Sequence, residues 1–349
     1  MNWKKRLFAA MLSGAVLTGA LAGCSGNTGA ADQSADTKTA DTDTPAKSGM
    51  DRSDINIKVV LKTLSSEYWQ YVKAGCDAAG RDLGVQVSVL GATSETAYDE
   101  QVQMIETTLS VADTDALVVA PLQAETVANL ITDTNLPVIA IDTQVESDKV
   151  RSFIGFDNEE MAAMGGKAAV EAAKAAGWTD ITCIGIAGVQ GDSTSESRMD
   201  GYQKGVEEAG GTFLENEMQY ANGITDQAVA SMEAIVQNHP EGIAIIIANN
   251  DDMAIGAKRA AAAYPQYKDT IFVGCGGNVA AMQAILNGEE TMTVAVDGYD
   301  VGYRGVQAAV DALEGKQLEA FISSPATIVT KDNAEEHMKQ VQAKENGQA

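Results

Sequence analysis

Histidine and cysteine are scarce in this sequence. Only two of its 349 residues are histidine, His239 and His337, and both stand in polar contexts at the ends of predicted helices. A histidine-based catalytic or metal site would have to use one of them, and we interpret both as surface residues. The four cysteines show no C-x-x-C spacing, which indicates neither a zinc site nor a disulfide framework; they are Cys24, Cys76, Cys183 and Cys275.

Motifs of nucleotide-dependent enzymes are missing too, because neither a P-loop nor a dinucleotide-binding fingerprint occurs. Positive charge is limited, since 24 lysines and arginines stand against 49 acidic residues, for a net charge of -25. An acidic chain whose N-terminus is not a basic helix-turn-helix is not typical of nucleic-acid binding. We therefore predict that the protein is not an enzyme, binds no metal, needs no cofactor and binds no nucleic acid.

The N-terminal region has the pattern of a secretion signal. Basic residues at 4–6 precede an apolar run over 7–23, which is short for a stable membrane span. The run ends in Leu21-Ala22-Gly23-Cys24. This ending resembles the bacterial lipobox, in which the cysteine receives a diacylglycerol; the alternative is an ordinary signal peptide with a chance cysteine. We predict a signal peptide with a lipobox over 1–24 and lipidation at Cys24.

Lipidation at Cys24 would leave the folded part outside the cytoplasm, in contact with the bacterial membrane only through its lipid anchor. Residues 25–53 are mainly Ala, Asp, Thr, Ser and Gly, without an aromatic residue. Such a segment cannot bury enough apolar surface to fold, and we predict a flexible tether. The remaining body begins at Asp54 and, at roughly 300 residues, suits two domains.

From Asp54 onward, strand-like and helix-like segments alternate. The apolar strands alternate with helical patterns, which is typical of parallel sheets covered by helices on both faces. The first set of predicted strands covers 55–61, 85–90, 116–120 and 137–141. The second set covers 152–158, 181–188, 212–220, 243–250, 270–277, 292–298 and 326–332. We predict an α/β fold with two doubly wound parallel-sheet lobes.

In open α/β sheets, ligands bind beyond the carboxyl ends of the strands. The segments that follow the predicted strands are rich in Asp and Asn and include aromatic residues, although aromatics make up only 5% of the chain. This combination suits a neutral, hydroxyl-rich ligand. The aromatic pair Tyr68 and Trp69 stands where the first strand gives way to a helix, and Asn222 follows the strand predicted at 212–220.

Seven motifs in order give the body a family resemblance. They are TLSSEYWQYVKAG (63–75), DALVVAPLQAETV (115–127), LPVIAIDTQ (136–144), IGFDN (154–158), ESRMDGYQKG (196–205), NNDDMAIGA (249–257) and FVGCGGN (272–278). With these motifs, residues 54–331 resemble the type 1 periplasmic-binding-protein superfamily. The nearest branch is the ribose-binding-protein-like receptors of ABC sugar importers.

The resemblance implies a set of ligand contacts. The aromatic pair that clamps the sugar ring corresponds to Tyr68 and Trp69, the carboxylate to Asp142, the arginine to Arg198, and an asparagine to Asn250. Four further positions depart from the family pattern, so the resemblance does not specify which sugar binds; they are Ser66, Thr143, Gly276 and Val296.

Each of these residues also has a structural interpretation. The aromatic pair could pack a helix start against the sheet, and Asp142 could form an Asx turn or cap a helix. Arg198 could pair with a neighbouring acid on its own helix, and Asn250 could cap the next helix.

The resemblance further implies how the chain is divided. It implies an N-terminal lobe of residues 54–155 plus 297–324 and a C-terminal lobe of residues 156–296 plus 325–349, joined by a three-segment hinge. The lobes would close on the ligand, and the closed form would dock on an ABC permease.

We predict a monomeric, extracytoplasmic solute-binding lipoprotein that captures a small sugar or polyol and delivers it to an ABC importer. The alternative is a ligand-sensing receptor of the same fold, which would serve a quorum signal, chemotaxis or a sensor kinase. The ligand also stays open at this point, since a polyol, a deoxy or amino sugar, a furanosyl signal or a nucleoside would suit the sequence.

Overall fold

The computed structural model describes residues 51–345. The predicted signal peptide, the lipidated Cys24 and the tether up to residue 50 lie outside the described residues, as do residues 346–349. The described part contains a short 3-10 helix, Arg52–Asp54, slightly before the start of the body predicted at Asp54. Arg52 joins this turn to the body through an ion pair with Glu314, at 2.6 Å between Nη2 and Oε1. No helix of the described part is long and apolar enough to cross a membrane.

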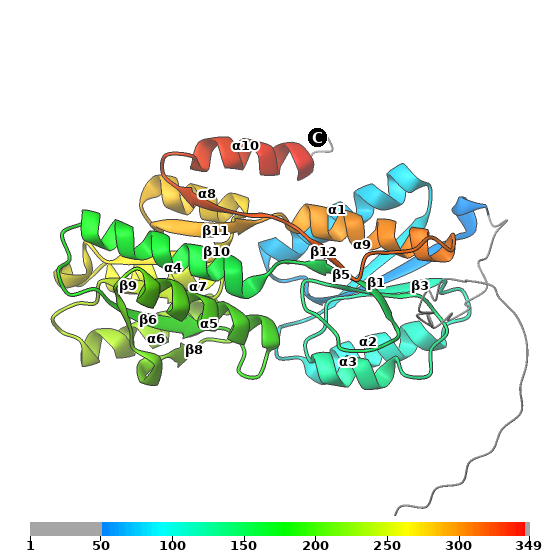
Figure 1. Cartoon of the computed structure of the whole chain (residues 1–349), viewed down its shortest axis with the longest axis horizontal. Coiled ribbons are helices and arrows are strands. Elements are labelled where there is room, and N and C mark those ends of the chain that lie inside the picture. Colours follow the sequence, from blue (N-terminus) through cyan, green and yellow to red (C-terminus); the bar gives the residue numbers. More distant parts are fainter. Residues whose placement is uncertain (1–50, 346–349) are drawn as a thin grey trace, which may run out of the picture. The chain divides into compact units, whose positions relative to one another are not determined.

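The first lobe is built on a sheet of six strands, all paired in parallel (Figure 1). Their spatial order is β12-β5-β4-β3-β1-β2. The bounds are β1 Asn56–Thr63, β2 Gln86–Ala92, β3 Ala116–Val119, β4 Val138–Ile141, β5 Val150–Gly155 and β12 Phe321–Ser323. The short strand β12 was not predicted; it joins the sheet edge far from the other strands in sequence.

Four helices cover this sheet. They are α1 Glu67–Leu83, α2 Tyr98–Ser110, α3 Ala124–Leu130 and α9 Gly298–Leu313. Helices α1 and α9 lie on one face and α2 and α3 on the other (Figure 1). Because α9 follows β11 of the second sheet, the first lobe is made from segments that are distant in sequence.

The second lobe is built on a sheet in the order β13-β11-β10-β9-β6-β7, with β8 also paired to β6. Its strands are β6 Thr182–Ala187, β7 Thr212–Phe213, β8 Gln219–Tyr220, β9 Ile245–Ala248, β10 Ile271–Gly276, β11 Met292–Val296 and β13 Ala326–Thr330. Its helices are α4 Asn158–Ala175, α5 Ser193–Glu208, α6 Thr225–Asn238, α7 Asp251–Ala261, α8 Val279–Asn287 and α10 Ala334–Glu345, with a 3-10 turn at Pro265–Tyr267.

Two details of this sheet differ from the predicted pattern. Strand β13 is antiparallel to β11, with Ala326 opposite Val296. The chain leaves the lobe at the end of β11 and returns at the same end, so the returning strand must run the other way. The segment 212–220 is two short strands rather than one, because eight residues, from Thr212 to Gln219, oppose only five, from Thr182 to Ile186. The surplus forms a 3-10 turn at Glu215–Glu217.

The chain passes between the two sheets three times: from β5 to α4, from β11 to α9, and from β12 to β13. Within each lobe the strands form the core, and Val59, Ile139 and Ile246 are fully buried. Each such side chain stabilises the fold by roughly 1.5–3 kcal/mol relative to exposure. The carboxyl ends of the strands are therefore fixed points from which the loops of the site extend.

Helices α1 and α9 approach so closely that only glycine fits at two positions. A Cβ atom on Gly75 would lie 2.0 Å from the carbonyl oxygen of Tyr299, and one on Gly302 would lie 2.0 Å from that of Val72. Backbone atoms occupy both spaces, so a larger residue cannot be accommodated by a rotamer change.

We expect Gly302→Ala to lower the free energy of unfolding by about 1–3 kcal/mol or more, because the added methyl group forces the two helices apart. The measurement is chemical denaturation followed by circular dichroism. The control is Arg304→Ala on the exposed face of the same helix, which loses only an ion pair with Asp300 and about 0.5 kcal/mol. Equal stability of Gly302→Ala and the wild type would contradict this packing.

Candidate functional site

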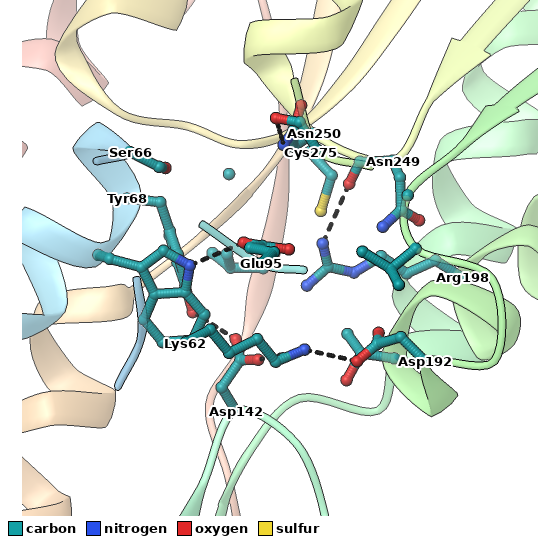
Figure 2. Close-up of a pocket in the computed structure, with 17 residues that line it drawn as sticks. Lys62, Ser66, Tyr68, Glu95, Asp142, Asp192, Arg198, Asn249, Asn250 and Cys275 are labelled. Carbon is teal, nitrogen blue, oxygen red and sulfur yellow. Dashed lines mark hydrogen bonds and ion pairs between the residues drawn. The ribbon is translucent and has the colours of Figure 1, made fainter. Parts of the chain in front are cut away.

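One cavity lies where the carboxyl-end loops of the two sheets meet. Both lobes line it (Figure 2). The lining residues are Lys62, Ser66, Tyr68, Trp69, Glu95, Asp142, Gly188, Val189, Asp192, Thr194, Arg198, Gly223, Asn249, Asn250, Cys275, Gly276 and Val296.

The structure brings together most of the residues singled out in the sequence. Eight of those ten positions line the cavity: Ser66, Tyr68, Trp69, Asp142, Arg198, Asn250, Gly276 and Val296.

The other two positions, Thr143 and Asn222, do not line it. Thr143 is 2% exposed, and its hydroxyl is used within the protein, 3.1 Å from Asp142 Oδ2 and 2.7 Å from Thr194 Oγ1. Asn222 donates from Nδ2 to Gln227 Oε1 at 2.8 Å, which turns its side chain along its own loop.

The two aromatic side chains are held by carboxylates. Strand β1 ends at Thr63 and α1 begins at Glu67, so Tyr68 and Trp69 fall in the first helical turn beside the strand's carboxyl end. The Tyr68 hydroxyl donates to Asp142 Oδ1 at 2.9 Å, and Trp69 Nε1 donates to Glu95 Oε1 at 3.0 Å. The rings meet edge to face, with centroids 5.0 Å apart and planes at 75°.

A buried ion pair joins the lobes inside the cavity. Lys62, at the end of β1, is 4% exposed. Its Nζ lies 2.8 Å from Oδ2 of Asp192, the residue that precedes α5, and 4.0 Å from Asp142 Oδ2. Burial by itself lowers the pKa of Lys62, but the carboxylates of Asp192, Asp142 and Glu95 outweigh it and raise the pKa above its usual value. The lysine is therefore charged.

Arg198 extends into the cavity from α5 and is 8% exposed. Its Nε donates to Asn158 Oδ1 at 2.9 Å, and its Nη1 donates to the backbone oxygen of Asn249 at 3.1 Å. Burial by itself lowers the pKa of Arg198, but the neighbouring Cys275 and Asp142 raise it by more. The net pKa is above its usual value, so the guanidinium stays protonated. No carboxylate of residues 51–345 lies within 4 Å of it, so the alternative of a surface pair on its own helix is not seen.

Asn250 has a capping role as well as a place in the cavity wall. Its Oδ1 accepts from the backbone N–H of Met253 at 2.9 Å, which caps α7. Its Nδ2 donates to the backbone oxygen of Gly223 at 3.2 Å. The two interpretations of this residue are therefore compatible.

Several cavity residues were not singled out from the sequence. Asp192 and Asn249 lie within segments that follow strands, so the strand-end rule reaches them, and Cys275 is the last residue but one of β10. Glu95 follows β2, and the same rule applied to that strand would have found it. A different sequence feature could have singled out Lys62. It stands at the end of an apolar strand, and a lysine that is buried there requires carboxylate partners.

A second group of acids lies behind the cavity wall. Asp251 accepts from Thr293 Oγ1 at 2.6 Å and from the Gly277 backbone N–H at 2.7 Å. Glu290 is 2% exposed, and neither of its oxygens has a hydrogen-bond donor among the described residues. Both carboxyl groups pack on Gly274, where a Cβ would lie 2.2 Å from Glu290 Oε1 and 2.4 Å from Asp251 Oδ1.

Burial, followed by the neighbouring Asp251, raises the pKa of Glu290 well above its usual value, and burial raises that of Asp251 to about 6. The folded state therefore binds more protons than the unfolded state above the usual pKa of these acids. Their contribution to stability is present at low pH and decreases as pH rises through the folded-state pKa values.

We expect Glu290→Gln to flatten the loss of unfolding free energy between about pH 6 and about pH 8, because the glutamine has no proton to lose. Urea denaturation at several pH values measures this slope. The exposed Glu106→Gln is the matched control and should keep the wild-type slope. Parallel pH profiles for the Glu290 variant and the wild type would show that Glu290 is not protonated in the fold.

Two α/β lobes with a polar, aromatic-lined cavity at their strand ends define a two-lobed ligand-binding protein. Residues 57–317 match the family described as "Periplasmic binding protein domain". The chain is 29% identical over 280 residues to the ribose import binding protein of Escherichia coli, covering 79% of this chain and 90% of that protein. It is 26% identical over 289 residues to the ribose import binding protein of Bacillus subtilis, covering 82% and 90%.

Among solved structures, a carbohydrate transporter solute-binding protein of Agrobacterium radiobacter in complex with D-arabinose superposes with a TM-score of 0.75. It is 26% identical, with 83% of this chain and 98% of that chain covered. The chain belongs to the periplasmic binding protein family, and the predicted fold class is confirmed. Members of this family are extracytoplasmic binding proteins of transport systems rather than enzymes.

Proposed function

We propose that the protein captures a small sugar or polyol in the cavity between its lobes and delivers it to an ABC importer. The observation that carries this proposal is the convergence of Arg198, Asp142 and an aromatic pair on one cavity lined by both lobes. An arginine and a carboxylate make charge-assisted hydrogen bonds to hydroxyl groups, and aromatic faces pack on the apolar faces of a sugar ring. Relatives named for ribose import and a homologue bound to D-arabinose support it.

The arrangement of the aromatic side chains favours a sugar over a nucleoside. A base is sandwiched between parallel rings, whereas Tyr68 and Trp69 meet edge to face at 75°. Their polar ends are also tied to Asp142 and Glu95. One ring face can therefore pack on a sugar, but the pair does not form two parallel walls.

The lobes of this proposal are residues 54–155 with 297–324, and 156–296 with 325–349. The three crossings between the sheets serve as the hinge. Polar contacts between described residues bridge the lobes directly in the present arrangement, which we therefore take as the closed form. They are Lys62–Asp192, Thr143–Thr194, Lys344–Asp297, and the backbone N–H of Ala280 in α8 donating to Glu67 Oε2 at 3.2 Å.

The finer parts of the proposal concern the ends of the chain and its partners. Lipidation at Cys24 would anchor the protein to the bacterial membrane, with residues 25–53 as the tether. The protein would act as a monomer, and its closed form would be recognised by the membrane permease. Recovery of a lipid-modified N-terminal peptide by mass spectrometry supports the anchor, and an unmodified Cys24 in membrane extracts would argue against it.

We expect the double variant Tyr68→Ala, Trp69→Ala to bind at least about tenfold more weakly, since a lost aromatic face removes about 1.4 kcal/mol or more. The ligand is first identified by a thermal-shift screen over sugars, polyols and nucleosides, and its affinity is then measured by titration calorimetry. The matched control is Tyr220→Ala, whose ring is 41% exposed outside the cavity. Undiminished affinity in the double variant would show that ligand does not bind at this wall.

A further prediction concerns the ion pair between the lobes. Removing one partner of a buried pair leaves an unpaired buried charge, at a cost of about 3–5 kcal/mol. Here that cost arises only in the closed form, because opening exposes Lys62 and Asp192 to water. We expect Lys62→Met to shift the ligand-free protein toward the open form, seen as a larger radius of gyration in small-angle X-ray scattering.

The double variant Lys62→Met, Asp192→Asn should recover part of the closed population, because position 192 then carries no charge that has lost its partner. The control is Lys204→Met, which removes an exposed ion pair with Glu159 within one lobe and should not change the radius of gyration. An unchanged radius in Lys62→Met would mean that this pair does not hold the lobes together.

A further inference from the structure

The charged groups of the cavity do not balance. Two cations line it, Lys62 and Arg198, together with three carboxylates, Glu95, Asp142 and Asp192. The ammonium of Lys62 lies 2.8 Å from Asp192 and 4.0 Å from Asp142, so these two acids share a counter-ion. Among the described residues, no lysine or arginine lies within 4 Å of a Glu95 oxygen. One negative charge is therefore in excess, and Glu95 is the carboxylate without a close counter-ion.

Glu95 extends from the first lobe to the second. Its Oε1 accepts a hydrogen bond from Trp69 Nε1. Its Oε2 faces the opposite lobe, because a Cβ atom on Gly223 would lie 3.4 Å from this oxygen and 3.6 Å from Asn250 Nδ2. Figure 2 shows the Glu95 carboxylate in the middle of the residues that line the cavity. Glu95 Oε2 thus offers an acceptor to a ligand held between the lobes.

A second acceptor in the cavity wall also lacks a donor. Asn249 lines the same cavity, and its Oδ1 is buried with no hydrogen-bond partner in the described part of the chain. A buried acceptor without a donor is unfavourable, because it has lost its hydrogen bonds to water. The cavity therefore has unused acceptors and one more carboxylate than cations, while Lys62 is already paired with Asp192 and Asp142.

We propose that the ligand is an amino-substituted sugar or polyol whose protonated amine lies against Glu95, an inference that rests on the sugar-binding function proposed above. An ammonium group supplies three donors and the missing positive charge, whereas a hydroxyl supplies one donor and no charge. The remaining hydroxyl groups of the ligand then meet Arg198 and Asp142. Closure of the lobes would bury a neutralised pair instead of a lone carboxylate.

A protonated Glu95 would lead to a different outcome. Burial raises the pKa of this carboxyl group, while Lys62 and the Trp69 hydrogen bond lower it. If Glu95 carried a proton, it would donate to a neutral sugar, and a glutamine in its place would bind that sugar equally well. Glu95→Gln therefore distinguishes the two cases, since glutamine keeps an oxygen for Trp69 but carries no charge.

The test compares matched pairs of ligands by titration calorimetry at a pH where the amine is protonated. The pairs are glucosamine and glucose, galactosamine and galactose, and mannosamine and mannose, with ribose, arabinose and inositol as further neutral ligands. We expect one amino sugar to bind the wild type at least about tenfold more tightly than its neutral partner, which is about 1.4 kcal/mol. This preference should disappear in Glu95→Gln and persist in Glu95→Asp.

Glu106→Gln, an exposed position on α2, removes the same charge far from the cavity and should keep the preference. Thermal unfolding of each variant verifies that it is folded.

A neutral sugar that binds the wild type as tightly as its amino partner overturns the inference and leaves the proposed function standing. A preference that survives in Glu95→Gln overturns the role of Glu95. Failure of every sugar and polyol to bind the wild type overturns the proposed function itself, and this inference with it.

Discussion

The buried ammonium of Lys62 is the group on which the cavity depends. A charge at the end of an apolar strand is tolerated only where carboxylates surround it, and Asp192 and Asp142 come from different lobes to do so. Asp142 in turn holds the Tyr68 hydroxyl and the Thr143 hydroxyl. The position of an aromatic wall residue and the contact between the lobes thus follow from one buried cation.

This arrangement ties ligand recognition to closure. The groups that bridge the lobes would each be hydrated if the lobes separated, so closing exchanges water for protein partners at little net cost. The first lobe is tightly packed, because glycine allows α1 and α9 to touch backbone to backbone. In the proposed closure, the three crossings would bend and the cavity walls would move as units.

The fold was accessible from the sequence because its signals are local. Strand and helix patterns alternate, and fully apolar strands indicate parallel sheets. Of the ten positions that the strand ends and the family resemblance singled out, eight line the cavity. The other two show what local patterns miss. Thr143 and Asn222 have the right place in the chain, but their side chains are taken by Thr194 and Gln227. Strand β13 runs antiparallel because of where the chain re-enters the lobe, which no local pattern records.

The sequence by itself determined the two α/β lobes, the aromatic pair at the first strand end and the polar nature of the loops, since these depend on periodicity and on neighbours along the chain. Only the tertiary structure decided which charges meet. Lys62 and Asp192 are 130 residues apart in the sequence. Glu95 has no lysine or arginine of the described chain within 4 Å of its carboxylate. Charge balance in a cavity is a property of distances in space, and these distances arise only when both lobes are folded and closed on each other.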